Sequence, residues 1–273
     1  MSNEKLTRDQ QREAARAKAK AMREAQKKNE GRKKLAIVLG SIVGGAGIIA
    51  GVVAIALSNP TPNTEPGAGP ATAIFDGGVR IGKDLEVLTS KSQVNNNIPN
   101  IVIYQDLQCP ACKAFEAPNM PQIRELVAAG KYTVEIHPIS FLDGQSVNEY
   151  SSRAASALLC VADKAPQKFL DYNDALYKNQ PNEGTAGPTN EQLQTLAQQI
   201  GVTEKPALDC ITNNTWAAWA KNKGSVVWTE KVPGTNLDFG GTPFVVVNGQ
   251  QYRGETANAA MFLQWLQTVA PVN

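Results

Sequence analysis

The 273-residue sequence has few of the side chains that bind transition metals. It contains four cysteines and a single histidine, His137. A structural zinc site needs four ligands, which usually come from two Cys-x-x-Cys pairs or from one such pair and two histidines. Only Cys109 and Cys112 have this spacing, and His137 lies in an apolar segment typical of a packed core. The sequence therefore argues against a zinc site, and we expect neither a metal nor a cofactor.

Most of the chain also lacks an excess of positive charge. Residues 1–34 carry twelve Lys or Arg against five Asp or Glu, whereas residues 35–273 carry fifteen against twenty. The net charge of +2 thus comes from the N-terminal tail. Because a nucleic-acid-binding domain carries its basic residues on the folded surface, we expect no nucleic-acid binding.

Residues 35–57 lack any charged side chain. As a helix they would span about 34 Å, enough for a hydrocarbon core of about 30 Å. They predict one transmembrane helix, with a cleaved signal peptide or a buried core helix as alternatives. The Lys and Arg residues before this segment place the basic tail, residues 1–34, in the cytoplasm and the C-terminal part outside it. The Pro- and Gly-rich residues 58–72 predict a linker.

Residues 73–273 predict one α/β domain. Strand patterns at 79–81 and 86–89 come first, and then an apolar strand at 101–104, a helix at 110–129 and a strand at 132–139 form a βαβ unit. Five helices follow, at residues 146–165, 167–178, 189–200, 205–213 and 215–228. A hairpin at 244–253 that turns at Asn248-Gly249 and a last helix at 258–269 complete the domain. This order indicates a thioredoxin-like fold with a helical insertion at about 142–235.

Cys109-Pro110-Ala111-Cys112 lies where a predicted strand hands over to a helix. The helix dipole and the free backbone N–H groups stabilise a thiolate there. Pro110 suits a first-turn position, where a missing N–H costs nothing. Two intervening residues let Cys112 reach Cys109, so the pair can close a reversible disulfide. A purely structural disulfide is the alternative.

These motifs resemble those of the DsbA-like thiol–disulfide oxidoreductases, in particular the membrane-anchored branch of Gram-positive bacteria. The resemblance rests on residues 104–112, on Gly241-Thr242-Pro243-Phe244 and on the Asn-Gly turn. It implies oxidation of paired cysteines in exported proteins and reoxidation by a quinone-linked membrane enzyme of the DsbB or VKOR type. It also implies that Pro243 is cis, faces the cysteine pair and, with Thr242, docks the substrate backbone.

Three positions bear on how far this resemblance extends. Strongly oxidising members of the family have a histidine where this chain has Ala111, so we expect a weaker oxidant. Thioredoxin-like proteins often bury an acid at the position held here by Ile103. Asp106 lies three residues before Cys109, and we interpret it either as a proton shuttle or as a turn-forming or helix-capping residue.

Cys160 and Cys210 fall in two predicted helices of the insertion. In an oxidising compartment we expect them to form a structural disulfide, which for 50 residues of separation stabilises by about 4 kcal/mol. Two alternatives to a disulfide oxidase stay open. One is a reductase or isomerase kept reduced by a membrane electron donor, and the other is a non-catalytic anchored binding domain.

Overall fold

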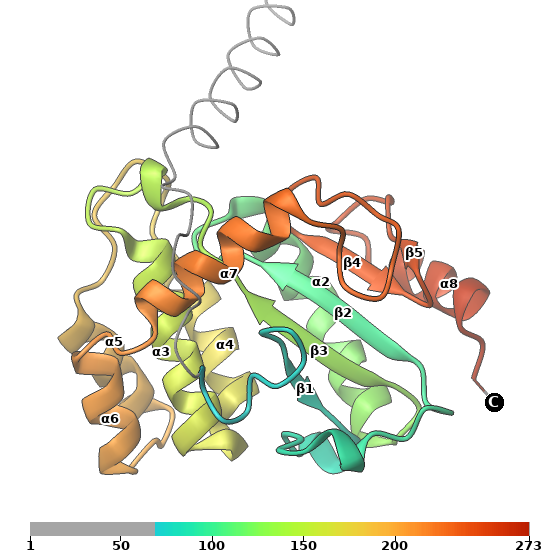
Figure 1. The fold of residues 1–273 in the computed structure, drawn as a ribbon, viewed down its shortest axis with the longest axis horizontal. Helices are drawn as coiled ribbons and strands as arrows, with labels where there is room; N and C mark the ends of the chain where they lie inside the picture. Colours follow the sequence, from blue (N-terminus) through green and yellow to red (C-terminus); the bar gives the residue numbers. More distant parts are fainter. Residues whose placement is uncertain (1–68, 273) are drawn as a thin grey trace, which may run out of the picture. The chain divides into compact units, whose positions relative to one another are not determined.

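The computed structural model describes residues 69–272. The predicted tail and transmembrane helix and most of the predicted linker lie outside the described residues. Within residues 69–272, no helix is long and apolar enough to span a bilayer. This part of the chain folds into a mixed five-stranded sheet with helices packed around it (Figure 1).

The sheet has the order β1-β3-β2-β4-β5. At its centre, β2 (Asn100–Gln105) pairs in parallel with β3 (Thr133–Pro138) and antiparallel with β4 (Phe244–Val247). The edges are β1 (Val79–Ile81) and β5 (Gln250–Gln251). The β4–β5 hairpin turns at Asn-Gly as predicted, because both turn residues have the positive φ that this dipeptide tolerates.

Side chains of β2 alternate between two apolar cores. Ile101 and Ile103 belong to the larger core, with α2 (Pro110–Ala128) and α8 (Ala259–Val269). Val102 and Tyr104 contact the smaller core, beside α7 (Ala217–Thr229). Figure 1 shows α7 in front of the sheet and α2 behind it. The strand is therefore covered on both faces, which explains its continuous apolar sequence.

Helices α3 to α6 form a cluster beside the sheet, between β3 and α7 in the chain (Figure 1). The start of α5 has a capping box, because Thr189 and Gln192 each accept the other's backbone N–H. The remaining bounds are α3 (Tyr150–Lys164), α4 (Phe169–Lys178), α5 (Asn190–Gln199), α6 (Lys205–Thr212) and the short 3₁₀ segments η1 (Lys83–Leu85), η2 (Lys91–Gln93), η3 (Asp143–Gln145) and η4 (Pro166–Lys168).

The predicted strand at residues 86–89 is reduced to a single bridge between Val87 and Ile81. Before it, Asp84 and Leu85 take left-handed backbone conformations, with φ of 58° and 62°. Both residues lie in η1, and the following segment forms only this one bridge with β1, together with a hydrogen bond from the Leu88 N–H to the Arg80 carbonyl oxygen at 2.8 Å.

Candidate active site

Cys109 and Cys112 lie at the N-terminal end of α2, just beyond the end of β2. Cys109 is the N-cap residue with an extended backbone, Pro110 is the first helical residue, and the Cys109 carbonyl accepts the N–H of Lys113 at 3.2 Å. Both cysteines are unpaired and buried, with exposed fractions of 6% and 2%. The strand-to-helix transition therefore holds both sulfurs at a helix start, as the sequence predicts.

Strand pairing brings Thr242 and Pro243 to the cysteines. Tyr104 of β2 faces Phe244, the first residue of β4, so the residues before Phe244 lie beside those that follow β2. The Thr242–Pro243 peptide bond is cis. The Cys109 thiol donates a hydrogen bond to the Thr242 carbonyl oxygen at 3.4 Å. The structure thus joins the two motifs that are 133 residues apart in the chain.

The two thiols differ in acidity. A hydrogen bond from the Cys112 side chain is the largest cause that lowers the pKa of Cys109, to about 7; Thr242 adds to it and burial opposes it. Burial is the largest cause that raises the pKa of Cys112, followed by hydrogen bonding to Cys109 and by its charge. At neutral pH Cys109 is thus partly thiolate and Cys112 is a thiol. Since the thiolate is the reactive form of a cysteine, Cys109 is the sulfur of the pair that is more available for reaction at neutral pH.

Asp106 is a buried acid in the turn before the cysteines. Its Oδ1 accepts the N–H of Gln108, and its Oδ2 accepts the N–H groups of Phe141 and Leu142, each at 2.9 Å. The Ser151 hydroxyl donates to the same Oδ2. Burial raises the pKa of Asp106 to about 6 although these hydrogen bonds lower it. Its contacts are those of a turn-forming residue that also fixes the loop after β3.

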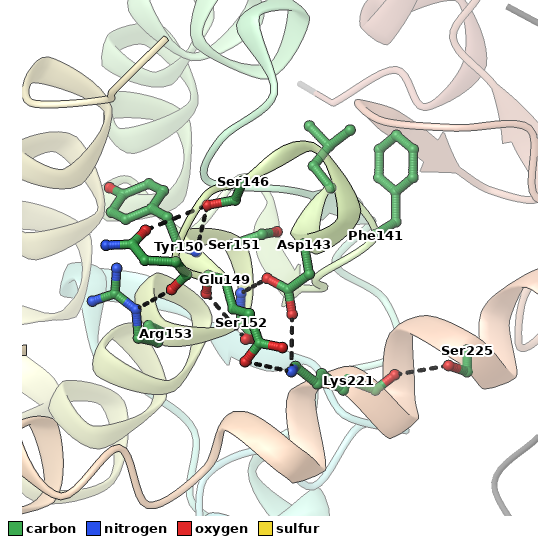
Figure 2. A network of polar contacts seen from close by, with 12 residues as sticks. Phe141, Asp143, Ser146, Glu149, Tyr150, Ser151, Ser152, Arg153, Lys221 and Ser225 are labelled. Atoms are coloured by element: carbon green, nitrogen blue, oxygen red, sulfur yellow. Dashed lines mark hydrogen bonds and ion pairs between the residues drawn. The ribbon is translucent and has the colours of Figure 1, made fainter. Parts of the chain in front are cut away.

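That loop is in turn attached to α7 (Figure 2). Lys221 of α7 lies with its Nζ 2.9 Å from Glu149 Oε2 and 3.4 Å from Asp143 Oδ2. Asp143 Oδ1 accepts the N–H of Ser152 at 2.8 Å, in the first turn of α3. The active-site turn, the loop before α3 and α7 therefore form one continuous set of polar contacts.

The end of α4 contacts the cysteine turn through two residues that the sequence did not single out. The Gln180 side-chain amide donates to the carbonyl oxygens of Leu107 at 3.1 Å and of Cys109 at 3.0 Å. The Tyr177 hydroxyl donates to the Asp106 carbonyl oxygen at 3.4 Å. No local pattern marks these residues, because their partners are more than 70 positions away.

Cys160 of α3 and Cys210 of α6 are joined by a disulfide, with their Cα atoms 5.6 Å apart. Cys160 is fully buried and Cys210 is 9% exposed. The bond ties together two helices of the cluster beside the sheet. It uses the two cysteines that lie outside the Cys-x-x-Cys motif.

His137 is a packed core side chain rather than part of the cysteine site. Its Nε2 lies 2.6 Å from Glu135 Oε1, and Arg80 pairs with the same carboxylate. The imidazole stacks on Tyr104 with ring centroids 4.1 Å apart. Within residues 69–272, no group of three or more His, Cys, Asp or Glu side chains is arranged to hold a metal ion.

Disulfide exchange needs two sulfurs of unequal acidity, because one must be attacked readily and the other must leave. Cys109 and Cys112 differ in this way within a thioredoxin-like fold. The fold and the site together place the protein among the thiol–disulfide oxidoreductases.

Comparisons with known proteins identify the family. The family model described as Thioredoxin matches residues 95–267, and the chain belongs to this family. DsbA of Mycobacterium tuberculosis in its reduced form is 28% identical, with a TM-score of 0.57 over 70% of this chain and 91% of that one. The disulfide bond oxidoreductase DsbG of the same organism, also reduced, is 29% identical, with a TM-score of 0.58 over 74% and 89%.

The curated relatives are much longer proteins. Serine/threonine-protein kinase PknE of Mycobacterium tuberculosis is 32% identical over 169 residues. The match covers 59% of this chain and 29% of the kinase. The similarity is therefore to one part of PknE.

Proposed function

We propose that this chain is a membrane-anchored enzyme that introduces disulfides into exported proteins through Cys109 and Cys112. The arrangement of the two sulfurs is the observation that carries the proposal. Cys109 has the lowered pKa and lies at a helix start. Its thiol is hydrogen-bonded to the carbonyl oxygen of Thr242, the residue before the cis proline. Cys112 is the more buried sulfur, with the raised pKa.

In the reaction that we propose, the oxidised enzyme has a Cys109–Cys112 disulfide. A substrate thiolate attacks Cys109 Sγ, the bond to Cys112 breaks, and Cys112 leaves with the electron pair and takes up a proton. A second substrate thiolate then attacks the mixed disulfide and releases Cys109 as a thiolate, which its pKa of about 7 favours. The substrate gains a disulfide, and the enzyme gains two electrons. Thr242 and Pro243 hold the substrate backbone beside Cys109.

The cellular setting follows from the disulfide in the helical cluster and from the predicted anchor. A stable Cys160–Cys210 bond is typical of an oxidising compartment. A transmembrane helix at 35–57 with a basic cytoplasmic tail would place the enzyme on the outer side of the membrane. Its partners there are exported cysteine-containing proteins and a quinone-linked reoxidase of the DsbB or VKOR type. Among the similar proteins, DsbG is named as a disulfide bond oxidoreductase.

Trapping of substrates tests this proposal. Cys112→Ser leaves Cys109 able to form a mixed disulfide but removes the thiol that would otherwise attack Cys109 and release the bound protein. We expect covalent adducts with exported proteins on non-reducing gels, identified by mass spectrometry. Cys109→Ser/Cys112→Ser is the matched control and should form none. A folded Cys112→Ser variant without adducts would contradict the proposal and favour a non-catalytic binding domain.

The acidity of Cys109 favours a second candidate, a reductase or isomerase kept reduced by a membrane electron donor. Thioredoxin has a nucleophilic cysteine of pKa about 7, and the strong oxidant DsbA one of about 3.5. The reduction potential of the Cys109–Cys112 pair in glutathione buffers separates the two. A value well above about −200 mV supports the oxidase, and a value near about −270 mV supports the reductase.

A further inference from the structure

A hollow of about 410 Å³ lies between α2 and α4. Its α2 wall extends from Lys113 to Arg124, and its α4 wall from Asp174 to Lys178. This volume falls within the range of ligand pockets, about 300–1,000 Å³. The reaction proposed above uses the turn before β4 and gives this hollow no task.

The hollow begins one helical turn after the reactive cysteine. Lys113 follows Cys109 by four residues, and Ala117 and Pro121 continue the same stripe of α2 along the hollow. From Lys113 to Arg124 the helix rises about 16 Å, which is the length of about five residues of extended chain. A polypeptide that reaches the sulfur of Cys109 can therefore continue along the hollow.

Glu116 gives the hollow a buried polar group with an unused oxygen. The residue is 5% exposed, and its Oε1 accepts a hydrogen bond from the Asn173 side chain. Its Oε2 has no hydrogen-bond partner within residues 69–272. Burial raises the pKa of Glu116 to about 8; the charge of Asp174 adds to this effect, and Arg124 and the Asn173 hydrogen bond oppose it. The carboxyl group is mainly protonated at neutral pH, so it can donate a hydrogen bond to a peptide carbonyl group.

Helix α2 also offers a hydrogen-bond acceptor on the same wall. Pro121 has no backbone N–H, so the carbonyl oxygen of Ala117 lacks its usual helical donor. Both residues are exposed and line the hollow, and Met120 adds apolar surface between them. This wall therefore presents an acceptor, a donor and apolar surface to a bound peptide.

Two lysines give the hollow an unpaired positive charge. Lys113 and Lys178 are exposed, and neither forms an ion pair in the described part of the chain, whereas Arg124 pairs with Asp171 and Asp174 at 2.8 and 3.1 Å. Residues 35–273 carry a net negative charge, so this positive charge is a local feature. It attracts a carboxylate and repels a lysine or arginine of a partner.

We propose that the hollow binds the polypeptide segment beside the reacting cysteine of a substrate and selects segments with acidic and apolar side chains. The acidic side chain lies against Lys113 and Lys178, and the apolar one against Met120. The peptide backbone bonds to Glu116 and to the Ala117 carbonyl oxygen. The preferred substrates are thus exported proteins with acidic and apolar residues next to a cysteine. The inference deepens the function proposed above and rests on it.

Oxidation of two matched peptides tests the inference. The full chain, in detergent with oxidised glutathione to restore its disulfide, receives a two-cysteine peptide flanked on both sides by Leu-Glu or by Leu-Lys. Loss of free thiols gives kcat/KM for each peptide. Because flanking charges also shift the pKa of the peptide thiols, the acidic-to-basic ratio of kcat/KM is compared between variants. Lys113→Glu/Lys178→Glu should lower this ratio at least about fivefold, since two attractions become repulsions. The change should appear in KM, because the hollow contacts the bound segment and not the sulfurs.

Two further variants separate docking from surface charge. Lys91→Glu/Lys131→Glu reverses two exposed lysines outside the hollow and should keep the native ratio. Ala117→Phe fills the hollow without changing its charge and should lower the ratio as well. A native ratio in Lys113→Glu/Lys178→Glu would overturn the inference. So would a native ratio in Ala117→Phe, because the lysines would then attract acidic peptides without a docked segment.

Anionic lipid is the competing occupant of the hollow. The native chain and Lys113→Glu/Lys178→Glu are compared again with phosphatidylglycerol added to the detergent micelles. We expect the difference between their ratios to persist. Its disappearance would assign the hollow to a lipid headgroup and overturn the inference. A native chain that oxidises neither peptide would instead reject the proposed disulfide oxidase.

Discussion

At the residue scale, the acidity of Cys109 does not depend on a side chain between the two cysteines. Ala111 is exposed and offers no donor, so the sulfur of Cys109 relies on Cys112, on Thr242 and on the backbone N–H at the start of α2. Two of these three sources are local in sequence. The third reaches the site only through the pairing of β4 with β2.

This arrangement predicts selective alkylation of the reduced protein. The thiolate fraction of Cys109 should rise as the pH passes about 7, because its pKa is lowered from 9.0, while Cys112 stays a thiol throughout. Iodoacetamide labelling at several pH values, read by mass spectrometry, should therefore modify Cys109 with a midpoint near pH 7. Equal labelling of both cysteines in the folded protein would show that the assigned asymmetry is incorrect.

Residue-level prediction from sequence succeeded where the signal was local. The position of Cys109 at a strand-to-helix junction follows from the apolar strand before it and from Pro110 after it. The burial of Asp106 and Glu116 could not be predicted from the local sequence, because the groups around them come from α3, α4 and the loop after β3.

At the scale of elements, the loop before α3 shows how side chains redefine a helix start. The sequence predicts a helix from residue 146, whereas α3 begins at Tyr150. Ser146 Oγ accepts the N–H of Tyr150, and Glu149 takes a left-handed backbone conformation with φ of 53° while it pairs with Lys221. These contacts replace the helical bonds of residues 146–149. Periodicity cannot show them, because Lys221 belongs to α7.

The bond between α3 and α6 predicts a measurable loss when it is removed. Cys160→Ala/Cys210→Ala should lower the free energy of unfolding by about 4 kcal/mol, since the bond closes a loop of 50 residues. Urea unfolding of the oxidised protein measures the change. Exchange at Cys109 in the folded double variant should persist. A decrease of less than about 1 kcal/mol in the free energy of unfolding would indicate that the disulfide does not restrict the conformations of the unfolded chain.

At the scale of the whole molecule, the proposed topology predicts that Cys109 is accessible to reagents from the outer side of the membrane. A thiol reagent that cannot cross membranes should label Cys109 in intact cells after mild reduction. Labelling only after lysis would place the domain inside the cell and contradict the predicted orientation of residues 35–57. Cys109→Ser provides the control for labelling at other sites.

The Gln180 side-chain amide donates hydrogen bonds to the carbonyl oxygens of Leu107 and Cys109, so the helical cluster is directly connected to the cysteine turn. This connection limits which segments can be exchanged with those of a homologue. A chimera that replaces the insertion with that of a homologue would import a foreign residue at position 180 and leave two carbonyl groups of the host turn unpaired. The junction of such a chimera should therefore lie after Gln180 rather than at the strand ends, so that Gln180 and the cysteine turn come from the same protein.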